Sequence, residues 1–126
     1  LFRTLYQAYK NNKILIPGSG EEIREFIHVK DAINAAILSM NKKYYNQNLL
    51  ITGLNRISLK ELSEIIKEIF NSKIKIKFVK ARKSHYKFTP FSLNRIKNKK
   101  IILDSYYDLS EGIIEIVEEI ENLNEK

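Results

Sequence analysis

The sequence predicts an α/β fold in which short strands alternate with four helices. Three segments have the length and patterning of strands, at Lys13–Ile16, Leu49–Thr52 and Ile74–Val79. Between and around them, apolar residues recur every three or four positions, which is the helical period. Hydrophobic residues make up 44% of the 126 residues, enough to bury a core. We expect a single domain over residues 1–126, since no linker or low-complexity block divides the chain.

The first part of the chain is predicted to form a helix, a strand and a turn. Leu1–Asn12 places its apolar residues on one helical face, and Lys13–Ile16 follows as a short strand. Pro17–Gly20 stops this strand with a turn composition. Glu25–Val29 is expected to link to the next helix, which Asp31 opens as N-cap or as an acid in its first turn.

That second helix, which runs to about Asn41, combines alanines with larger apolar residues. They are Ala32, Ile33, Ala35, Ala36, Ile37 and Met40. Small side chains let a helix approach its neighbour closely, so we expect tight packing. Leu49–Thr52 is continuously apolar and ends at Gly53, which is typical of a strand covered on both faces.

The second half of the chain is predicted to contain two more helices and a strand with one wet face. Ser58-Leu-Lys-Glu61 is a capping box, and an apolar stripe follows it to Phe70. Ile74–Val79 alternates apolar residues inward with lysines outward. Asp108 opens the last helix. Its residues expected to face inward are Leu109, Ile113, Ile116, Val117, Ile120 and Leu123.

Charge is unevenly distributed along the chain. The net charge is +7, from 22 basic and 15 acidic residues. Lys73–Lys100 contains eleven Lys or Arg residues and no acid, whereas Asp104–Lys126 contains eight acidic residues and one lysine. The basic stretch fits either an anionic partner or a solvated lysine-rich face. One functional hypothesis is therefore a nucleic-acid-binding module over Lys73–Lys100, with Tyr86, Phe88 and Phe91 as stacking aromatics.

Composition argues against several kinds of site. There is no Cys, which excludes disulfide frameworks, cysteine metal sites and thiol nucleophiles. Two histidines are too few for a histidine-built metal site. No apolar run reaches the roughly 20 residues that cross a bilayer, and no signal-peptide pattern opens the chain. We expect a soluble cytoplasmic protein and, because the chain begins at Leu1 and not at Met, a piece of something longer.

Two motifs that often carry chemistry are weak here. Tyr6–Lys10 and Tyr9–Lys13 both match Tyr-x-x-x-Lys, which on a helix places a phenol beside an ammonium. Tyr and Lys are common in this chain, and an amphipathic helix explains both matches. Gly18-Ser19-Gly20 lacks the third glycine and the later acid of a dinucleotide-binding fingerprint, so we interpret it as a turn.

Arg24-Glu-Phe-Ile-His-Val-Lys-Asp31 is the most informative segment. An arginine close to a turn leads a short apolar stretch into a helix, which directs the guanidinium in a way suited to gripping phosphate. A surface Arg24 paired with Glu21 or Glu22 explains the spacing equally well. His28 lies inside the apolar stretch and is interpreted as a structural histidine, not a catalyst.

The same segment resembles the Arg-Asp-Phe-Ile-His-Val-Asp-Asp motif of NAD-dependent epimerase/dehydratases, the extended short-chain dehydrogenase/reductases that act on nucleotide sugars. Pro17-Gly18-Ser19-Gly20 is similar to the family's turn ahead of that motif. Leu49-Leu-Ile-Thr-Gly53, followed by Ile57-Ser58-Leu59, is similar to its strand, loop and helix. Asp108-Leu-Ser-Glu-Gly112-Ile113 resembles the start of its final helix, so the resemblance covers essentially the whole chain.

The resemblance implies that the chain is the C-terminal, substrate-binding portion of such an enzyme, lacking most of its Rossmann domain. In the family, the arginines matching Arg24 and Arg82 bind the diphosphate of the nucleotide sugar. The strand matching Leu15 to Pro17 lies near the base, so Leu15 and Pro17 join the implied site. The implied substrate is a UDP-, GDP-, CDP- or dTDP-sugar. Lys30 replaces the first acid of the family's usual pair, and Arg82 lacks the Pro-Gly-Asp that commonly follows it.

The resemblance also implies what belongs outside this chain. The family's glycine fingerprint for NAD(P) and its catalytic Tyr-x-x-x-Lys precede this region, so no catalytic, cofactor-binding or metal-binding residue is assigned here. The intact enzyme is expected to transfer a hydride transiently from the sugar to its cofactor, and this chain alone is expected to be inactive. Its own N-terminal Rossmann domain is the expected partner.

An isolated copy of the chain is expected to self-associate. Leu49–Thr52 has no evident strand partner in so short a chain, and an unpaired edge readily recruits a copy of itself. A purely structural oligomerisation domain is the third functional hypothesis. Nucleic acid and membrane are not expected partners under the resemblance.

Overall fold

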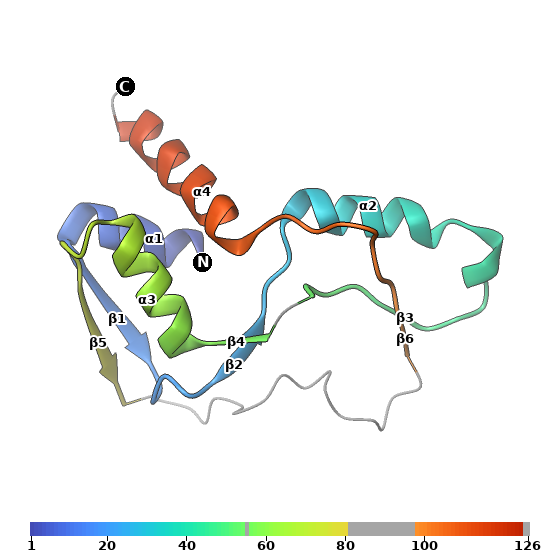
Figure 1. Cartoon of the computed structure of the whole chain (residues 1–126), viewed down its shortest axis with the longest axis horizontal. Helices are drawn as coiled ribbons and strands as arrows, with labels where there is room; N and C mark the ends of the chain where they lie inside the picture. The colour runs from blue at the N-terminus through green and yellow to red at the C-terminus, as the bar shows by residue number, and fades with distance from the viewer. Residues whose placement is uncertain (55, 81–97, 125–126) are drawn as a thin grey trace.

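The computed structural model describes residues 1–54, 56–80 and 98–124, and it confirms the α/β class with four α-helices in these ranges. The helices are α1 (Phe2–Asn11), α2 (Val29–Ser39), α3 (Leu59–Ile69) and α4 (Leu109–Asn124). A short 3-10 helix, η1 (Lys42–Tyr44), follows α2. Figure 1 shows an elongated arrangement, in which α1, α3 and α4 gather at one end and α2 extends towards the other.

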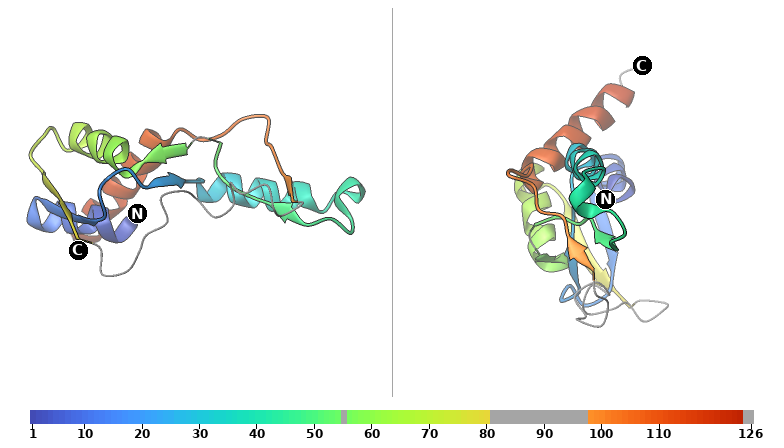
Figure 2. Two further views of the ribbon diagram at one scale, coloured as in Figure 1. Left: turned by 90° about the horizontal axis from the view of Figure 1, so that it is seen from below. Right: turned by 90° about the vertical axis from the view of Figure 1, so that its right-hand side faces the viewer.

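Each sheet in the described residues joins two strands that are far apart in the sequence. β1 (Lys13–Pro17) pairs in parallel with β5 (Lys75–Val79), β2 (Ile23–Glu25) pairs antiparallel with β4 (Arg56–Ser58), and β3 (Leu49–Leu50) pairs in parallel with β6 (Lys99–Lys100). The β2·β4 pair lies between the two ends of the molecule (Figures 1 and 2).

The larger core lies between the β1·β5 sheet and the three helices α1, α3 and α4. Its buried residues are Leu5, Ala8, Ile14, Ile16, Leu62, Ile66, Ile74, Ile113 and Ile120. Ile14 and Ile16 are buried, whereas Lys13, Leu15 and Pro17 are exposed, because successive side chains of a strand point to opposite faces. One face of the β1·β5 sheet is thus covered by helices, and these strands carry exposed side chains on the other.

Capping groups set the helix starts. The Ser58 hydroxyl accepts from the Glu61 backbone N–H at 3.1 Å, and the Glu61 carboxylate accepts from the Ser58 N–H at 2.8 Å, so the capping box is confirmed. The Asp108 carboxylate accepts from the Ser110 N–H at 2.7 Å at the start of α4. His28 Nδ1 accepts from the Lys30 N–H at 3.3 Å, which makes His28 the N-cap of α2 and Asp31 an acid in its first turn.

The prediction that the second helix, α2, packs tightly against a neighbour is wrong. Ile33, Ile37 and Met40 of α2 are 54%, 61% and 73% exposed. Only Ala35 and Asp31 are buried on this helix, and Ala35 belongs to a second, smaller core. The alanines predicted a close neighbour, but α2 reaches beyond the larger core, where little of the described chain covers it (Figure 1).

Expectations for two strand segments and for one residue of the last helix also need correction. Leu49–Thr52 is not covered on both faces: β3 contains only Leu49 and Leu50, both are half-buried, and they pair with Lys99 and Lys100 of β6. The segment therefore has a strand partner within the chain. The β2·β4 pair was not expected, because three residues are too few to show alternation. Leu123, expected to face inward, is 60% exposed near the end of α4.

The strand with one wet face is confirmed. Lys75 and Lys77 of β5 are exposed, whereas Ile76 and Phe78 are half-buried against the larger core. The nucleic-acid hypothesis rests largely on Tyr86, Phe88, Phe91 and the basic residues near them, which lie outside the described residues.

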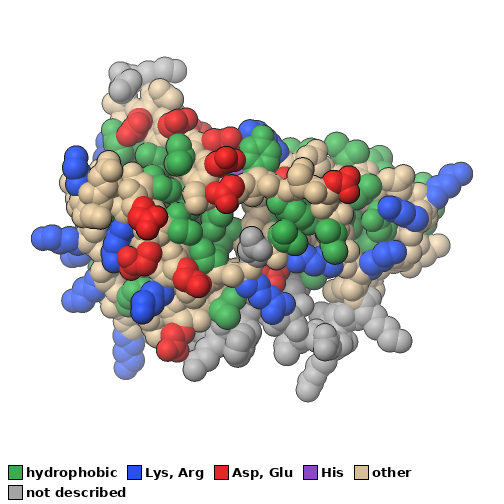
Figure 3. All heavy atoms as spheres, viewed as in Figure 1, with side chains coloured by type: hydrophobic (Ala, Val, Ile, Leu, Met, Phe, Trp, Pro, Cys, Tyr) green, Lys and Arg blue, Asp and Glu red, His purple; other side chains and the backbone are tan. Residues whose placement is uncertain are grey.

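The acidic side chains of the last two helices form a distinct face. Figure 3 shows them gathered over α3 and α4 in this view. Most of the basic stretch from Lys73 to Lys100 lies outside the described residues.

Candidate functional site

The turn that joins β1 to β2 is held by the carboxylate of Glu22. The Ser19 N–H donates to Glu22 Oε1 at 3.0 Å, and the Gly20 N–H donates to Oε2 at 2.9 Å. Gly18 and Gly20 have φ angles of +126° and +92°, which residues with a Cβ rarely adopt. Glu22 is 7% exposed, and the backbone hydrogen bonds, led by the one from Ser19, hold the pKa of Glu22 below its ordinary value.

The same hydrogen bonds decide whether this turn fits NAD. A dinucleotide cradle needs glycine amides that face the pyrophosphate where a strand turns into a helix. Here the amides of Ser19 and Gly20 donate to Glu22, the Gly18 N–H donates to the Val79 carbonyl at 2.9 Å, and the chain continues into β2. The turn therefore does not fit the pyrophosphate, and its interpretation as a structural turn is confirmed.

Arg24 lies in β2, opposite Ile57 of β4, and is half-buried. Its Nη1 donates to the Ile23 carbonyl at 2.8 Å. The preceding turn is also tied to the start of α3, since the Leu59 N–H donates to the Glu22 carbonyl at 3.0 Å and the Lys60 N–H to the Gly20 carbonyl at 2.9 Å. The backbone that carries Arg24 is thus fixed by the turn before it and by the ladder with β4.

Leu15 and Pro17 lie together on the exposed face of β1. Leu15 is 48% exposed, and in the parallel ladder it pairs with Lys77, while Pro17 pairs with Val79. Both are near the carboxyl end of the β1·β5 pair, where the turn towards Arg24 begins. Leu15 and Pro17 thus lie in β1 before the turn, and Arg24 lies in β2 after it. Arg82, the fourth implied site residue, lies outside the described residues.

The sequence suggested only one role for Glu22, that of an ion-pair partner for Arg24. Both of its carboxylate oxygens accept from the amides of the turn. The available signal was the acid placed two residues after Gly20, at a distance where it can fold back onto the turn.

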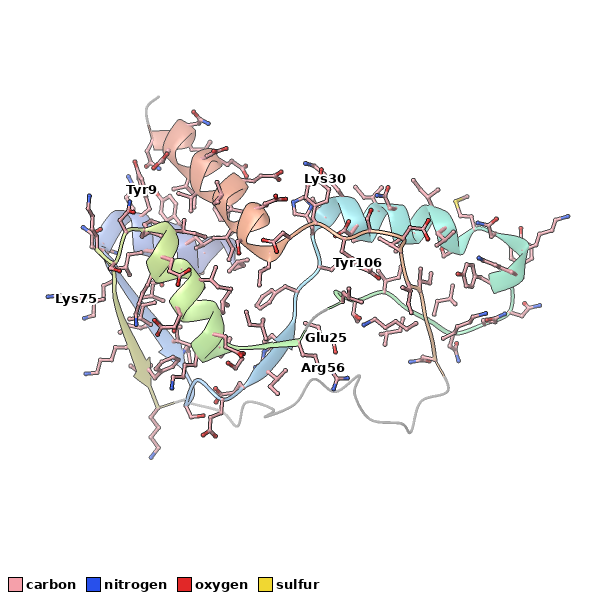
Figure 4. All side chains as sticks on the ribbon, viewed as in Figure 1. Tyr9, Glu25, Lys30, Arg56, Lys75 and Tyr106 are labelled. Atoms are coloured by element: carbon pink, nitrogen blue, oxygen red, sulfur yellow. The ribbon has the colours of Figure 1, made fainter. Side chains whose placement is uncertain are left out.

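Nothing in the sequence indicated an ion-pair cluster next to Arg24, because the three residues of β4 are too few to show a strand pattern. Arg56 Nε donates to Glu25 Oε1 at 2.8 Å across the β2·β4 ladder, and Lys100 Nζ lies 3.9 Å from Glu25 Oε2 (Figure 4). Burial raises the pKa of Glu25, but the bonds from Arg56 and Thr52 and the charge of Lys100 outweigh it, so the net shift is downward. This cluster stabilises the strand that carries Arg24.

A second cluster fastens α2 to α4 and explains why lysine is tolerated at position 30. Lys30 Nζ lies 3.2 Å from Glu115 Oε1 and donates to the Tyr107 hydroxyl at 3.3 Å. His28 stacks on the Tyr107 ring, and its Nε2 lies 3.1 Å from Glu115 Oε2. The hydrogen bond from Lys30 is the main cause that lowers the pKa of Glu115. His28 therefore has structural partners, as its interpretation requires.

Other features of the described residues do not coincide with this site. A cleft of about 640 Å³ is lined by parts of β4, α3 and residues 106–110, and none of Leu15, Pro17 or Arg24 lines it. Lys10 Nζ lies 5.9 Å from the centre of the Tyr6 ring on α1, in line with an ordinary amphipathic helix. Within residues 1–54, 56–80 and 98–124, no cluster suits a metal ion, and no helix is long and apolar enough to cross a membrane.

The sequence is similar to a family of epimerases and dehydratases and to individual enzymes named for nucleotide sugars. A family model described as the NAD dependent epimerase/dehydratase family matches residues 1–50. The chain is 31% identical to a putative GDP-L-fucose synthase 2 of Arabidopsis thaliana over 78 residues, which cover 60% of this chain and 24% of that protein. It is 26% identical to a UDP-glucuronate 4-epimerase of Thermodesulfobacterium geofontis over 113 residues, which cover 90% of this chain and 35% of that protein. The chain thus spans roughly a quarter to a third of these relatives' length.

Solved structures show the same fold. A GDP-L-fucose synthetase from Naegleria fowleri matches 100% of this chain and 39% of its own, with a TM-score of 0.72 and 18% identity. A UDP-glucuronic acid 4-epimerase from Bacillus cereus, in complex with UDP-glucuronic acid and NAD, matches 97% of this chain and 40% of its own, with a TM-score of 0.71 and 19% identity. The resemblance to NAD-dependent epimerase/dehydratases is thus supported by the family model over residues 1–50 and by relatives that match larger parts of the chain, and the solved structures share its fold.

Proposed function

We propose that this chain is the C-terminal, nucleotide-sugar-binding domain of a longer sugar-nucleotide epimerase or dehydratase, with Arg24 positioning the substrate diphosphate. One observation carries the proposal: the exposed carboxyl end of the parallel β1·β5 pair meets a turn that leads directly to Arg24. In α/β proteins, ligands bind outside the carboxyl ends of parallel strands. An arginine fixed at that place suits an anionic ligand.

The chemistry of Leu15, Pro17 and Arg24 supports a nucleotide as that ligand. A guanidinium presents a planar fork of donors, which matches phosphate oxygens and forms charge-assisted hydrogen bonds. Leu15 and Pro17 offer an exposed apolar surface on the same side of the turn, suited to a planar base. Holding a substrate at both ends restricts its orientation, which is a large part of what a binding domain contributes to catalysis. We include Arg82 as a second ligand of the diphosphate only because its position in the sequence resembles that of the family's second arginine.

In this proposal the cofactor and the catalytic acid–base groups belong to an N-terminal Rossmann domain of the intact enzyme. The turn between β1 and β2 favours this division, because its amides are engaged by Glu22 and do not fit a pyrophosphate. NAD or NADP bound in that domain would supply hydride chemistry. The described residues would bind the substrate and keep its diphosphate in place.

The test measures nucleotide-sugar binding by the intact protein that contains this chain. Calorimetric titration of UDP-, GDP-, CDP- and dTDP-sugars first identifies the substrate class. Arg24→Ala is expected to weaken its binding by at least about tenfold, since a hydrogen bond to a charged group contributes roughly 1.5–3 kcal/mol. Arg24→Lys is expected to restore only part of the loss, because a point charge does not reproduce the fork.

Arg3→Ala is the matched control, since Arg3 is an exposed arginine on α1. Arg56→Ala is a poor control, because it deprives the half-buried Glu25 of its closest cation. Unchanged affinity in Arg24→Ala, with the circular dichroism spectrum of the folded protein, contradicts the proposal.

A further inference from the structure

The side chains on the exposed face of the β1·β5 sheet change from basic at one end to apolar at the other. In a parallel ladder, paired residues point to the same face, so this face consists of three rows. The rows are Lys13 with Lys75, Leu15 with Lys77, and Pro17 with Val79. Cations therefore occupy the end far from the turn, apolar groups the end near it, and Lys77 the middle row beside Leu15.

Lys77 is available to a ligand. It is exposed, and among the described residues no hydrogen bond or ion pair engages its ammonium group. Lys75 lies two residues earlier on the same face, and Figure 4 shows its side chain pointing away from the helices. No acidic side chain belongs to any of the three rows, so the face attracts electron-rich ligand atoms.

The position of Lys77 relative to Arg24 indicates which part of a nucleotide it meets. Rows along a strand are separated by about 6.6 Å, two residues at about 3.3 Å each. The Leu15 row is therefore one step further than the Pro17 row from the turn that leads to Arg24. A nucleotide whose diphosphate is held at Arg24 and whose base lies over Pro17 and Leu15 brings the edge of its base to Lys77.

We propose that Lys77 sets the base preference of the site by donating a hydrogen bond to an exocyclic carbonyl oxygen of the base. This inference rests on the proposed function. A lysine ammonium has three donors and no acceptor. It therefore favours the carbonyl of uracil, thymine or guanine over the amino group that cytosine or adenine carries at the corresponding position. The substrate class that follows is a UDP-, dTDP- or GDP-sugar.

The experiment compares nucleotide affinities in the intact protein by calorimetric titration with UDP, CDP, GDP and ADP. The unmodified protein is expected to prefer UDP over CDP, or GDP over ADP, by about tenfold. Lys77→Met is expected to abolish that preference. Lys77→Glu is expected to reverse it, because a carboxylate accepts from an amino group and repels a carbonyl oxygen. Lys75→Met, one row further from the base, is the matched control and is expected to keep the preference.

The ratio of two affinities in one protein does not depend on the fraction that is folded, so partial misfolding of a variant does not obscure the result. No preference in the unmodified protein, or the same preference in both Lys77 variants, overturns the inference. An Arg24→Ala arm separates the two proposals. If it weakens all four nucleotides while the Lys77 variants keep the original ratio, only the inference fails. If it binds all four normally, the proposed function fails and the inference fails with it.

Discussion

At the scale of single residues, Glu22 holds the turn that precedes the proposed site, although it is not expected to touch a substrate. Its two oxygens bind the amides of Ser19 and Gly20 and so hold the glycine turn that precedes Arg24. An almost buried carboxylate is stabilised here by backbone dipoles rather than by a cation. We therefore expect the position of Arg24 to depend on whether Glu22 is ionised.

This dependence predicts a pH-sensitive contribution of Glu22 to stability. The pKa of Glu22 is lowered in the folded protein, so its contribution is fully present above the ordinary value of 4.5 and is lost as the pH falls through the lowered value. Glu22→Gln is expected to lower the free energy of unfolding by about 1–3 kcal/mol at pH 7. The difference from the unmodified protein is expected to shrink as the pH approaches 3.

Urea denaturation at a series of pH values measures both quantities. Glu21→Gln, exposed in the same turn, is the control and is expected to change the free energy of unfolding by less than about 0.5 kcal/mol. A Glu22→Gln effect that is constant from pH 7 to pH 3 would show that the charge plays no part.

At the scale of elements, one close backbone approach holds the segment after β3 against the segment before α2. A Cβ added at Gly53 would overlap the carbonyl oxygen of Phe26, a backbone atom that has little freedom to move. A Cβ at Gly112, on α4, would meet only the Cδ2 atom of His28, at 3.1 Å. The two glycines therefore differ in what an added methyl group displaces.

Gly53→Ala is expected to destabilise the fold by about 1–3 kcal/mol, the usual cost of overpacking. Gly112→Ala is expected to be close to neutral, since alanine's better helix propensity, worth up to about 1 kcal/mol, offsets a small shift of the His28 ring. Thermal unfolding followed by circular dichroism compares them. Equal melting temperatures for the two variants would contradict the close approach at Gly53.

The elements also show where sequence patterns carry information and where they do not. The capping box of Ser58 and Glu61 and the alternation in β5 are local patterns, and both are confirmed. The pairing of β2 with β4 joins Ile23–Glu25 to residues about thirty positions later in the chain. Each strand has three residues, which is too short to show the alternation of apolar and polar residues that identifies a strand. For the same reason, only the family resemblance assigned Leu15, Pro17 and Arg24 to one site. No sequence pattern singled out Lys77, because its position beside Leu15 follows from the register of the β1·β5 ladder.

At the scale of the whole molecule, α2 leaves an apolar face uncovered. Ile33 and Ile37 lie one turn apart and are more than half exposed. Apolar patches of this kind on a helix usually mark a contact surface. In the intact enzyme we propose that the N-terminal Rossmann domain covers this face, and in the isolated chain we expect a second copy to do so.

The isolated chain is therefore expected to self-associate at tens of micromolar, roughly the range in which small apolar interfaces begin to hold. Changing Ile33 and Ile37 together to Gln is expected to shift the population towards monomer, because it removes the apolar stripe and keeps good helix formers. Sedimentation equilibrium gives the mass. Ile114→Gln on α4, at a residue 43% exposed, is the control. A monomeric unmodified chain would contradict the expectation.

The central claim is that Arg24 holds a nucleotide diphosphate at the carboxyl end of the β1·β5 pair, and a crystal structure of the intact protein with its preferred nucleoside diphosphate tests it most directly. Phosphate oxygens are expected within about 3 Å of the Arg24 guanidinium nitrogens, the usual length of a charge-assisted hydrogen bond. The base is expected to lie against Leu15 and Pro17. A diphosphate bound elsewhere in the protein, with Arg24 making no contact to it, would contradict this role of Arg24.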